Sequence, residues 1–117
     1  MKNLESLIAE TSYRLVEKGV VDKNTIDKLL RVLVNDGLYA FWVYMKSKGI
    51  DQKFKQGAKE VLNLLGKEKA DTENLEKFFK EVTKDIDKIF FARQVLEKLL
   101  IYARYHLKAK ENEASKQ

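Results

Sequence analysis

Residues 29–49 read LLRVLVNDGLYAFWVYMKSKG, and this stretch decides the fold. A leucine-rich segment with helical spacing runs into the Asn-Asp-Gly step at 35–37, and an aromatic segment with helical spacing follows it and ends at Gly49. Asn and Gly tolerate a bend or a left-handed backbone, and the aromatic side chains supply large apolar area. The stretch predicts two helices joined at a corner, although a single kinked helix also fits the pattern.

The rest of the composition favours an all-α chain of one domain. The sequence has 117 residues, no proline and only five glycines, so nothing in it forbids long helices. We expect a single compact bundle of about five or six helices over residues 1–110. Residues 111–117 are polar and without periodicity, so we expect a disordered tail there.

The apolar spacing also predicts individual helices and their ends. A first helix is expected to end at Gly19, and an uninterrupted helix is expected over residues 54–65. Asp71 or Thr72 can cap a later helix. A long final helix is expected to start near Asp85 and to run through the middle of the bundle. Its expected core positions are Ile86, Ile89, Phe90, Val95, Leu96, Leu99, Leu100, Ala103 and Leu107.

Four aromatic residues at 39–44 cover more than half of their helix, so they cannot all point inward. We expect Phe41 and Trp42 in the core or in a protein interface, and Tyr39 and Tyr44 at its edge.

Composition excludes several classes of protein. Without cysteine, the chain has no disulfide framework and no Cys-ligated zinc or iron-sulfur site. Its N-terminal segment lacks the apolar core of a signal peptide, and its longest apolar run is far shorter than the roughly 20 residues that cross a bilayer. We therefore expect a cytoplasmic protein.

Catalysis has little support in the sequence. The single histidine, His106, has Tyr102 and Ala103 where a carboxylate would have to lie on the same helical face. No Gly-rich phosphate loop, nucleophile elbow or paired-Asp nuclease motif is present. We expect no enzyme, no catalytic residue, no metal and no cofactor; a pocket that gathers carboxylates around His106 would indicate the opposite.

Basic residues give a stronger signal in a chain of net charge +5. Five lysines crowd the end of the aromatic helix and the start of the next one: Lys46, Lys48, Lys53, Lys55 and Lys59. They are candidate phosphate contacts, and the competing interpretation is an ordinary solvated face. Arg14 and Lys18 are spaced i, i+4 and project from one helical face, and Arg104 and Lys108 have the same spacing. Like charges so spaced cost a few tenths of a kcal/mol, which bound phosphate or a nearby carboxylate would offset.

The order of these features resembles one known family. The Asn-x-Gly-Leu step at 35–38 with Phe41 after it, the Lys-Ser-Lys-Gly end at 46–49 and the Leu-x-x-Tyr-Ala-Arg segment at 99–104 are similar to the small all-helical subunit of the Cmr-type (type III-B) CRISPR effector. That effector is an RNA-guided complex that targets RNA in antiviral defence, and the resemblance extends over most of the chain.

The resemblance implies a non-catalytic structural subunit that is present in several copies, which stack beside the backbone subunits of the complex. The implied partners are those subunits, copies of the chain itself, and the guide RNA paired to target RNA. It also implies that Lys46, Lys48 and Arg104 contact backbone phosphates. With the candidates from spacing and charge added, the expected RNA contacts are Arg14, Lys18, Lys46, Lys48, Lys53, Arg104 and Lys108.

Two alternatives remain open. Many members of the family carry a proline before the Asn-Gly step, and this chain has none, which leaves a sister small subunit of a type III-A or archaeal cascade complex as an alternative. The alternative from another class is a helical protein-protein interaction adaptor that binds no nucleic acid and docks through its aromatic helix. Clustering of basic side chains on one surface favours RNA, and even dispersion favours the adaptor.

Overall fold

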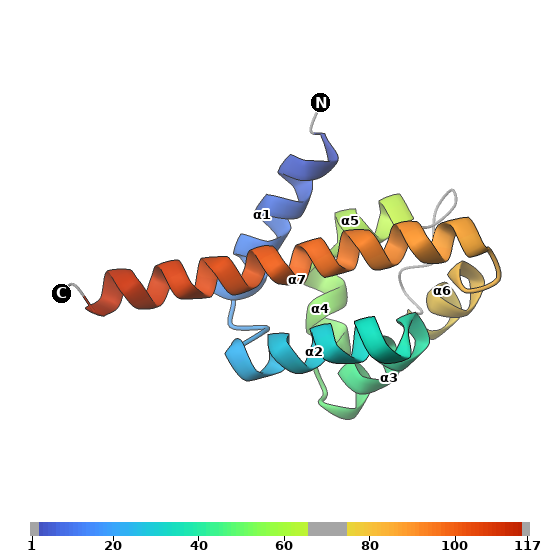
Figure 1. Ribbon diagram of the computed structural model, residues 1–117, viewed down its shortest axis with the longest axis horizontal. Helices are drawn as coiled ribbons and strands as arrows, with labels where there is room; N and C mark the ends of the chain where they lie inside the picture. Colours follow the sequence, from blue (N-terminus) through green and yellow to red (C-terminus); the bar gives the residue numbers. More distant parts are fainter. Residues whose placement is uncertain (1–2, 66–74, 116–117) are drawn as a thin grey trace.

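The computed structural model describes residues 3–65 and 75–115, and within them the chain is all-α, as the sequence predicts. Seven helices and no strand are found in this part of the chain (Figure 1). The helices are α1 Leu4–Glu17, α2 Lys23–Asp36, α3 Leu38–Ser47, α4 Asp51–Gly57, α5 Lys59–Leu65, α6 Leu75–Val82 and α7 Ile86–Ser115.

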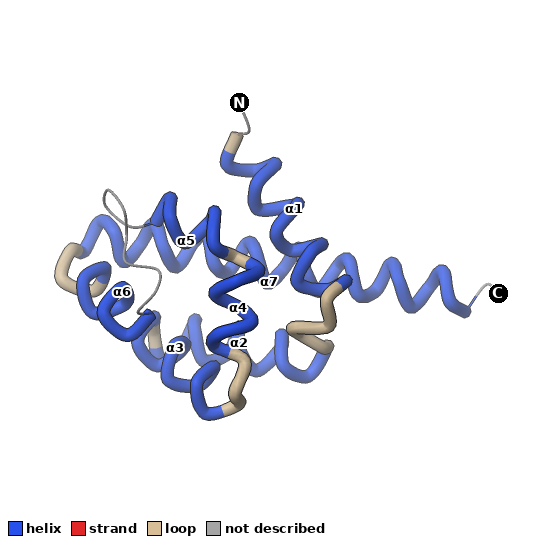
Figure 2. The backbone as a smooth tube through the Cα atoms, turned by 180° about the vertical axis from the view of Figure 1, so that it is seen from behind, coloured by secondary structure: helices blue, strands red, loops and turns tan. Residues whose placement is uncertain are grey.

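Helix α7 organises the arrangement. It runs along the whole length of the molecule, α1 crosses it and α2 runs beside it (Figure 1). Seen from behind, α4 and α5 lie on the other side of α1 from the projecting end of α7, and α3 packs against α2 (Figure 2). The C-terminal end of α7 extends beyond the other helices in both views.

Short polar side chains begin the helices. Asn3 accepts a hydrogen bond from the backbone N–H of Ser6, and Asp22 accepts one from the N–H of Thr25, both at 2.7 Å. The Thr25 hydrogen bonds hold the pKa of the Asp22 carboxyl below its usual value. Asp85 caps α7, where the sequence places the start of the final helix.

The core stripe of α7 is partly as predicted. Its central positions are buried, namely Ala92, Val95, Leu96, Leu99, Leu100 and Ala103. Ile89 and Leu107 are partly buried and pack against the core. The prediction is wrong for Ile86, which is 70% exposed, and for Phe90, which is 58% exposed. Within residues 3–65 and 75–115, the buried positions of α7 lie on one side of the helix, and its other side is exposed even where the sequence is apolar all round. The helix therefore lies along the bundle and does not run through its middle.

Gly37 makes the corner between α2 and α3. Its φ of +95° with ψ of −176° lies in a region that essentially only glycine adopts. Its N–H donates to the carbonyls of Val32 and Leu33 at the end of α2, and its own carbonyl accepts from the N–H of Phe41 in α3. The two helices are therefore separate, and the interpretation as one kinked helix is wrong.

The corner turns the aromatic face of α3 inward. Phe41 and Trp42 are buried, whereas Tyr39 is 44% exposed and Tyr44 is half-buried. The predicted division of the aromatic residues between core and edge is confirmed.

The single helix expected over 54–65 is wrong, because the chain breaks at Ala58 into α4 and α5. Gly57, at the break, lies against α1: a Cβ on Gly57 would be 2.6 Å from Cδ2 of the buried Leu15. Glycine at this position permits the close approach and weakens the helix at the same point.

Residues 111–115 are helical and form the last part of α7, so the expectation of a disordered tail is wrong for them. They contain no glycine or proline and include good helix formers, which continue a helix without an apolar stripe. The expected cap at Asp71 or Thr72, and residues 116–117, lie outside the described residues.

Alanine substitution of Gly37 tests how much its backbone conformation at the corner contributes to stability. No heavy atom lies within 4 Å of a Cβ built on Gly37 or on Gly19, so neither alanine variant introduces a steric clash. Gly37→Ala is expected to lower the free energy of unfolding by about 2–3 kcal/mol, because an L-residue is strained there. Gly19→Ala, at a φ of +69°, is expected to cost about 1 kcal/mol. Urea denaturation of both variants measures the difference, and equal midpoints would contradict this account of the corner.

Candidate nucleic-acid interface

Two predicted RNA contacts from different helices, Lys18 at the C-terminal end of α1 and Lys53 in the first turn of α4, line one hollow. Lys18, Val20, Lys53, Gln56 and Gly57 line a hollow of about 220 Å³, which we call the α1–α4 hollow. The sequence placed Lys18 in one pair and Lys53 in a separate run, and only the fold shows that they line one hollow.

The local structure at the end of α1 forms one wall of the hollow. Gly19 adopts a φ of +69°, its N–H donates to the carbonyl of Val16, and the N–H of Val20 donates to the carbonyl of Leu15, both at 3.0 Å. This pair of hydrogen bonds is the Schellman motif, which ends a helix at a glycine. It satisfies the last carbonyls of α1 and turns the chain so that Lys18 and Val20 face α4.

Arg14 does not line the α1–α4 hollow; it lines a neighbouring hollow of about 390 Å³ that it shares with Lys18, Tyr13, Glu10 and Glu17. Its Nη1 donates to the carbonyl oxygen of Gly57 at 3.2 Å, and the side chain is half-buried. This bond joins α1 to α4 and satisfies the last carbonyl of α4. A role for Arg14 as an RNA contact stays a prediction, and it would have to be reconciled with this structural bond.

Two further candidates lie at the end of α3, each against an aromatic ring one turn earlier. The Nζ atom of Lys46 is 5.0 Å from the centroid of the Trp42 ring, and the Nζ atom of Lys48 is 5.7 Å from that of Tyr44. Both lysines are exposed. Cation–π contacts restrict the two side chains while their charges stay open to solvent.

The candidates on α7 are arranged differently. The Nε atom of Arg104 lies 3.6 Å from Oδ1 of Asp27 in α2, so a carboxylate accompanies this guanidinium. Lys108 is exposed. Of the two explanations for the like charges at 104 and 108, the nearby carboxylate is the one observed.

His106 is half-buried, and its ring meets the Tyr13 ring edge-on with centroids 5.5 Å apart. No group of three or more His, Cys, Asp or Glu side chains that could hold a metal ion is found among the described residues.

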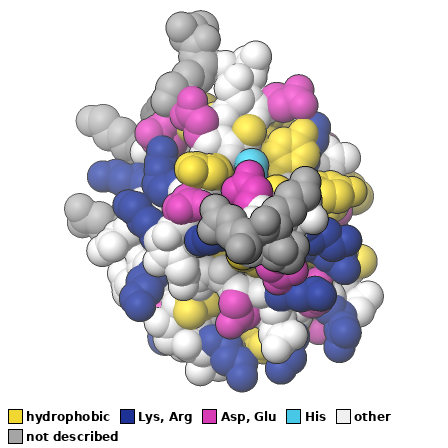
Figure 3. Space-filling view, turned by 90° about the vertical axis from the view of Figure 1, so that its left-hand side faces the viewer, with side chains coloured by type: hydrophobic (Ala, Val, Ile, Leu, Met, Phe, Trp, Pro, Cys, Tyr) yellow, Lys and Arg dark blue, Asp and Glu magenta, His cyan; other side chains and the backbone are white. Residues whose placement is uncertain are grey.

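Basic side chains do not gather into one patch on the end of the molecule that Figure 3 shows. Lys and Arg appear at several places around this face, with Asp and Glu between them (Figure 3). The face that Figure 3 shows therefore carries mixed charge.

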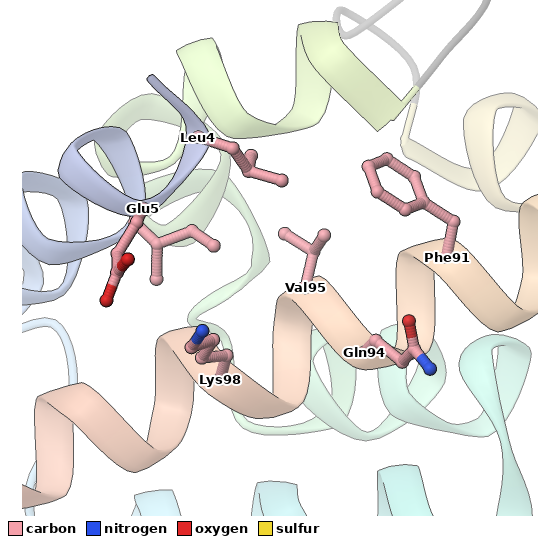
Figure 4. A pocket seen from close by; sticks show the side chains of 7 residues that line it. Leu4, Glu5, Phe91, Gln94, Val95 and Lys98 are labelled. Atoms are coloured by element: carbon pink, nitrogen blue, oxygen red, sulfur yellow. The ribbon is translucent and has the colours of Figure 1, made fainter. Parts of the chain in front are cut away.

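A second feature, the α1–α7 groove, was missed from the sequence. It has a volume of about 480 Å³ and is lined by Leu4, Glu5, Ile8, Phe91, Gln94, Val95 and Lys98. Leu4 and Phe91 face each other across it and Val95 lies between them, with the polar groups at the margin (Figure 4). The Phe90-Phe91 pair was the available signal, and we assigned that segment of the final helix to the core.

Comparisons with known proteins add no relative: no family model, no curated protein and no solved structure matches the chain. None of the helices in the described part of the chain combines the length and the apolar character that a bilayer crossing requires.

A substitution at Arg14 tests whether this side chain stabilises the fold, independently of any RNA binding. Arg14→Gln removes the Nη1 donor and leaves the Gly57 carbonyl without its partner, so we expect the free energy of unfolding to fall by about 1–3 kcal/mol. Lys18→Gln is the matched control and is expected to leave it nearly unchanged. Urea denaturation tests both. An unchanged midpoint for Arg14→Gln would show that the bond to Gly57 does not stabilise the fold.

Proposed function

We propose that this chain is a non-catalytic small subunit of a type III-B CRISPR (Cmr) effector complex, acting in the cytoplasm in antiviral defence. In this role it stacks with copies of itself beside the backbone subunits and contacts the phosphates of guide and target RNA through basic side chains. The resemblance at 35–49 and 99–104 supports the family assignment.

The observation that carries the RNA-binding part is the meeting of Lys18 and Lys53 in the α1–α4 hollow. The two lysines come from helices far apart in the sequence, and no carboxylate is among the residues that line the hollow. Lysines on an ordinary solvated surface have no reason to line one hollow, because their charges repel one another.

The mechanism is electrostatic. Lysine and arginine bind phosphates without reading bases, and sequence choice is delegated to pairing between guide and target. Lys46 and Lys48 at the end of α3 present further exposed charges, held by their aromatic rings. An isolated subunit is expected to bind RNA weakly and with a steep dependence on salt.

The adaptor without nucleic-acid binding remains the second candidate, since two observations favour it. The charges on the face in Figure 3 are mixed, and the N-terminal end of α7 exposes Ile86, Phe90 and Phe91. Exposed apolar side chains of this size mark contacts with other proteins. A subunit of an RNA-guided complex needs such contacts too, so the two candidates differ in RNA binding alone.

RNA binding therefore discriminates between them. We expect the purified protein to bind a guide–target RNA duplex without sequence preference, and Lys46→Glu/Lys48→Glu to weaken this binding strongly at every salt concentration where it is measurable. Fluorescence anisotropy with a labelled duplex, titrated with salt, measures both.

Lys28→Glu/Arg31→Glu is the control, because it reverses two exposed charges on α2 that belong to no candidate site. Equal losses in the two double variants would mean that net charge alone governs binding. No binding by the wild type at low salt would leave the adaptor as the better account.

A further inference from the structure

We infer that the α1–α4 hollow binds one phosphate of the RNA backbone between Lys18 and Lys53. This inference rests on the proposed function and narrows it from a set of seven basic residues to one site with defined ligands.

The size of the hollow favours a single small group. Its volume of about 220 Å³ is below the roughly 300–1,000 Å³ of sites that enclose drug-sized ligands. A phosphate with its two ester oxygens leading outward suits such a hollow, whereas a nucleotide with its base does not. The polar lining is Lys18, Lys53 and the side-chain amide of Gln56, all of which can donate hydrogen bonds to phosphate oxygens.

Neither lysine of the α1–α4 hollow forms an ion pair with a described carboxylate, so both can bind a phosphate. Within the described part of the chain, neither Lys18 nor Lys53 lies within ion-pair distance of a carboxylate. Glu17, the sequence neighbour of Lys18, has its Oε1 atom 3.9 Å from Nζ of Lys110 on α7. Glu17 and Glu10 also line a neighbouring hollow together with Lys18, so carboxylates stand near this lysine without pairing with it.

Several backbone carbonyls at the helix ends beside the hollow have hydrogen-bond partners. Both α1 and α4 end here, and unpaired carbonyls would repel an anion. However, the carbonyls of Leu15 and Val16 accept the N–H groups of Val20 and Gly19, and the carbonyl of Gly57 accepts Nη1 of Arg14. Arg14 is thus a positioning residue here: it occupies the carbonyl that would otherwise face the anion.

The alternative is that the two lysines merely offset the partial negative charge of two helix ends. In that case, removal of the lysines leaves the salt dependence of RNA binding unchanged. A second alternative is that the two lysines bind two separate phosphates. Lysines that share one phosphate contribute one contact together, whereas lysines that bind separate phosphates contribute two. Each phosphate contact adds close to 1 to the slope of log affinity against log salt concentration.

The test measures that slope for a guide–target RNA duplex with wild type, Lys18→Gln, Lys53→Gln and the double variant Lys18→Gln/Lys53→Gln. We expect the double variant to reduce the slope by close to 1, and neither single variant to reduce it by more than the double variant does. Lys18→Arg/Lys53→Arg is expected to keep the wild-type slope, because it keeps both charges. The urea midpoint of each variant verifies that it is folded.

Lys28→Gln/Arg31→Gln is the matched control, since it removes two exposed charges outside the hollow and is expected to leave the slope unchanged. A reduction of about 2 in the double variant would overturn the shared site in favour of two separate phosphates. Wild-type slopes for all the hollow variants would show that RNA binds elsewhere, with the proposed function intact. Absence of RNA binding by the wild type would overturn the proposed function and this inference together.

Discussion

The close contact between Leu15 in α1 and Gly57 at the end of α4 is the constraint on which both the core and the candidate site depend. Leu15 is fully buried, and the absence of a side chain on Gly57 lets the two helices approach to a distance that a Cβ would forbid. The same approach brings the carbonyl of Gly57 to Arg14 and places Lys53 across from Lys18. A bulkier residue at position 57 would move α4 away, and the α1–α4 hollow would open with it.

The sequence predicts the elements that depend on local chemistry. The helical class follows from composition, and the corner at Gly37 follows from a step that only glycine can complete. Periodicity is sufficient to place Phe41 and Trp42 in the core. The ends of α1 and α3 fall at Gly19 and Gly49, whose positive φ angles the glycines already indicated.

Features that depend on tertiary packing could not be predicted in this way. Nothing local indicates that Gly57 divides residues 54–65 into two helices, since the reason is Leu15, more than forty residues earlier in the chain. Ile86 and Phe90 are apolar like core residues, yet their side of α7 is exposed in the part of the chain that the structure describes. The candidate site shows the same limit. Spacing pairs Lys18 with Arg14, and the two do line one hollow together with Glu10 and Glu17. Only the fold shows that Lys18 also lines a hollow with Lys53 and that Arg14 has a backbone partner.

The central claim is that this small helical chain contacts RNA phosphates through particular basic side chains and not through its net charge. The most direct test is to map backbone amide chemical shifts of the isotope-labelled protein while a guide–target RNA duplex is added. The account predicts that the largest shifts fall at Lys18, Gln56 and Gly57 around the α1–α4 hollow and at the end of α3, with little change at α6. Shifts confined to the α1–α7 groove, or spread evenly over the surface, would contradict it.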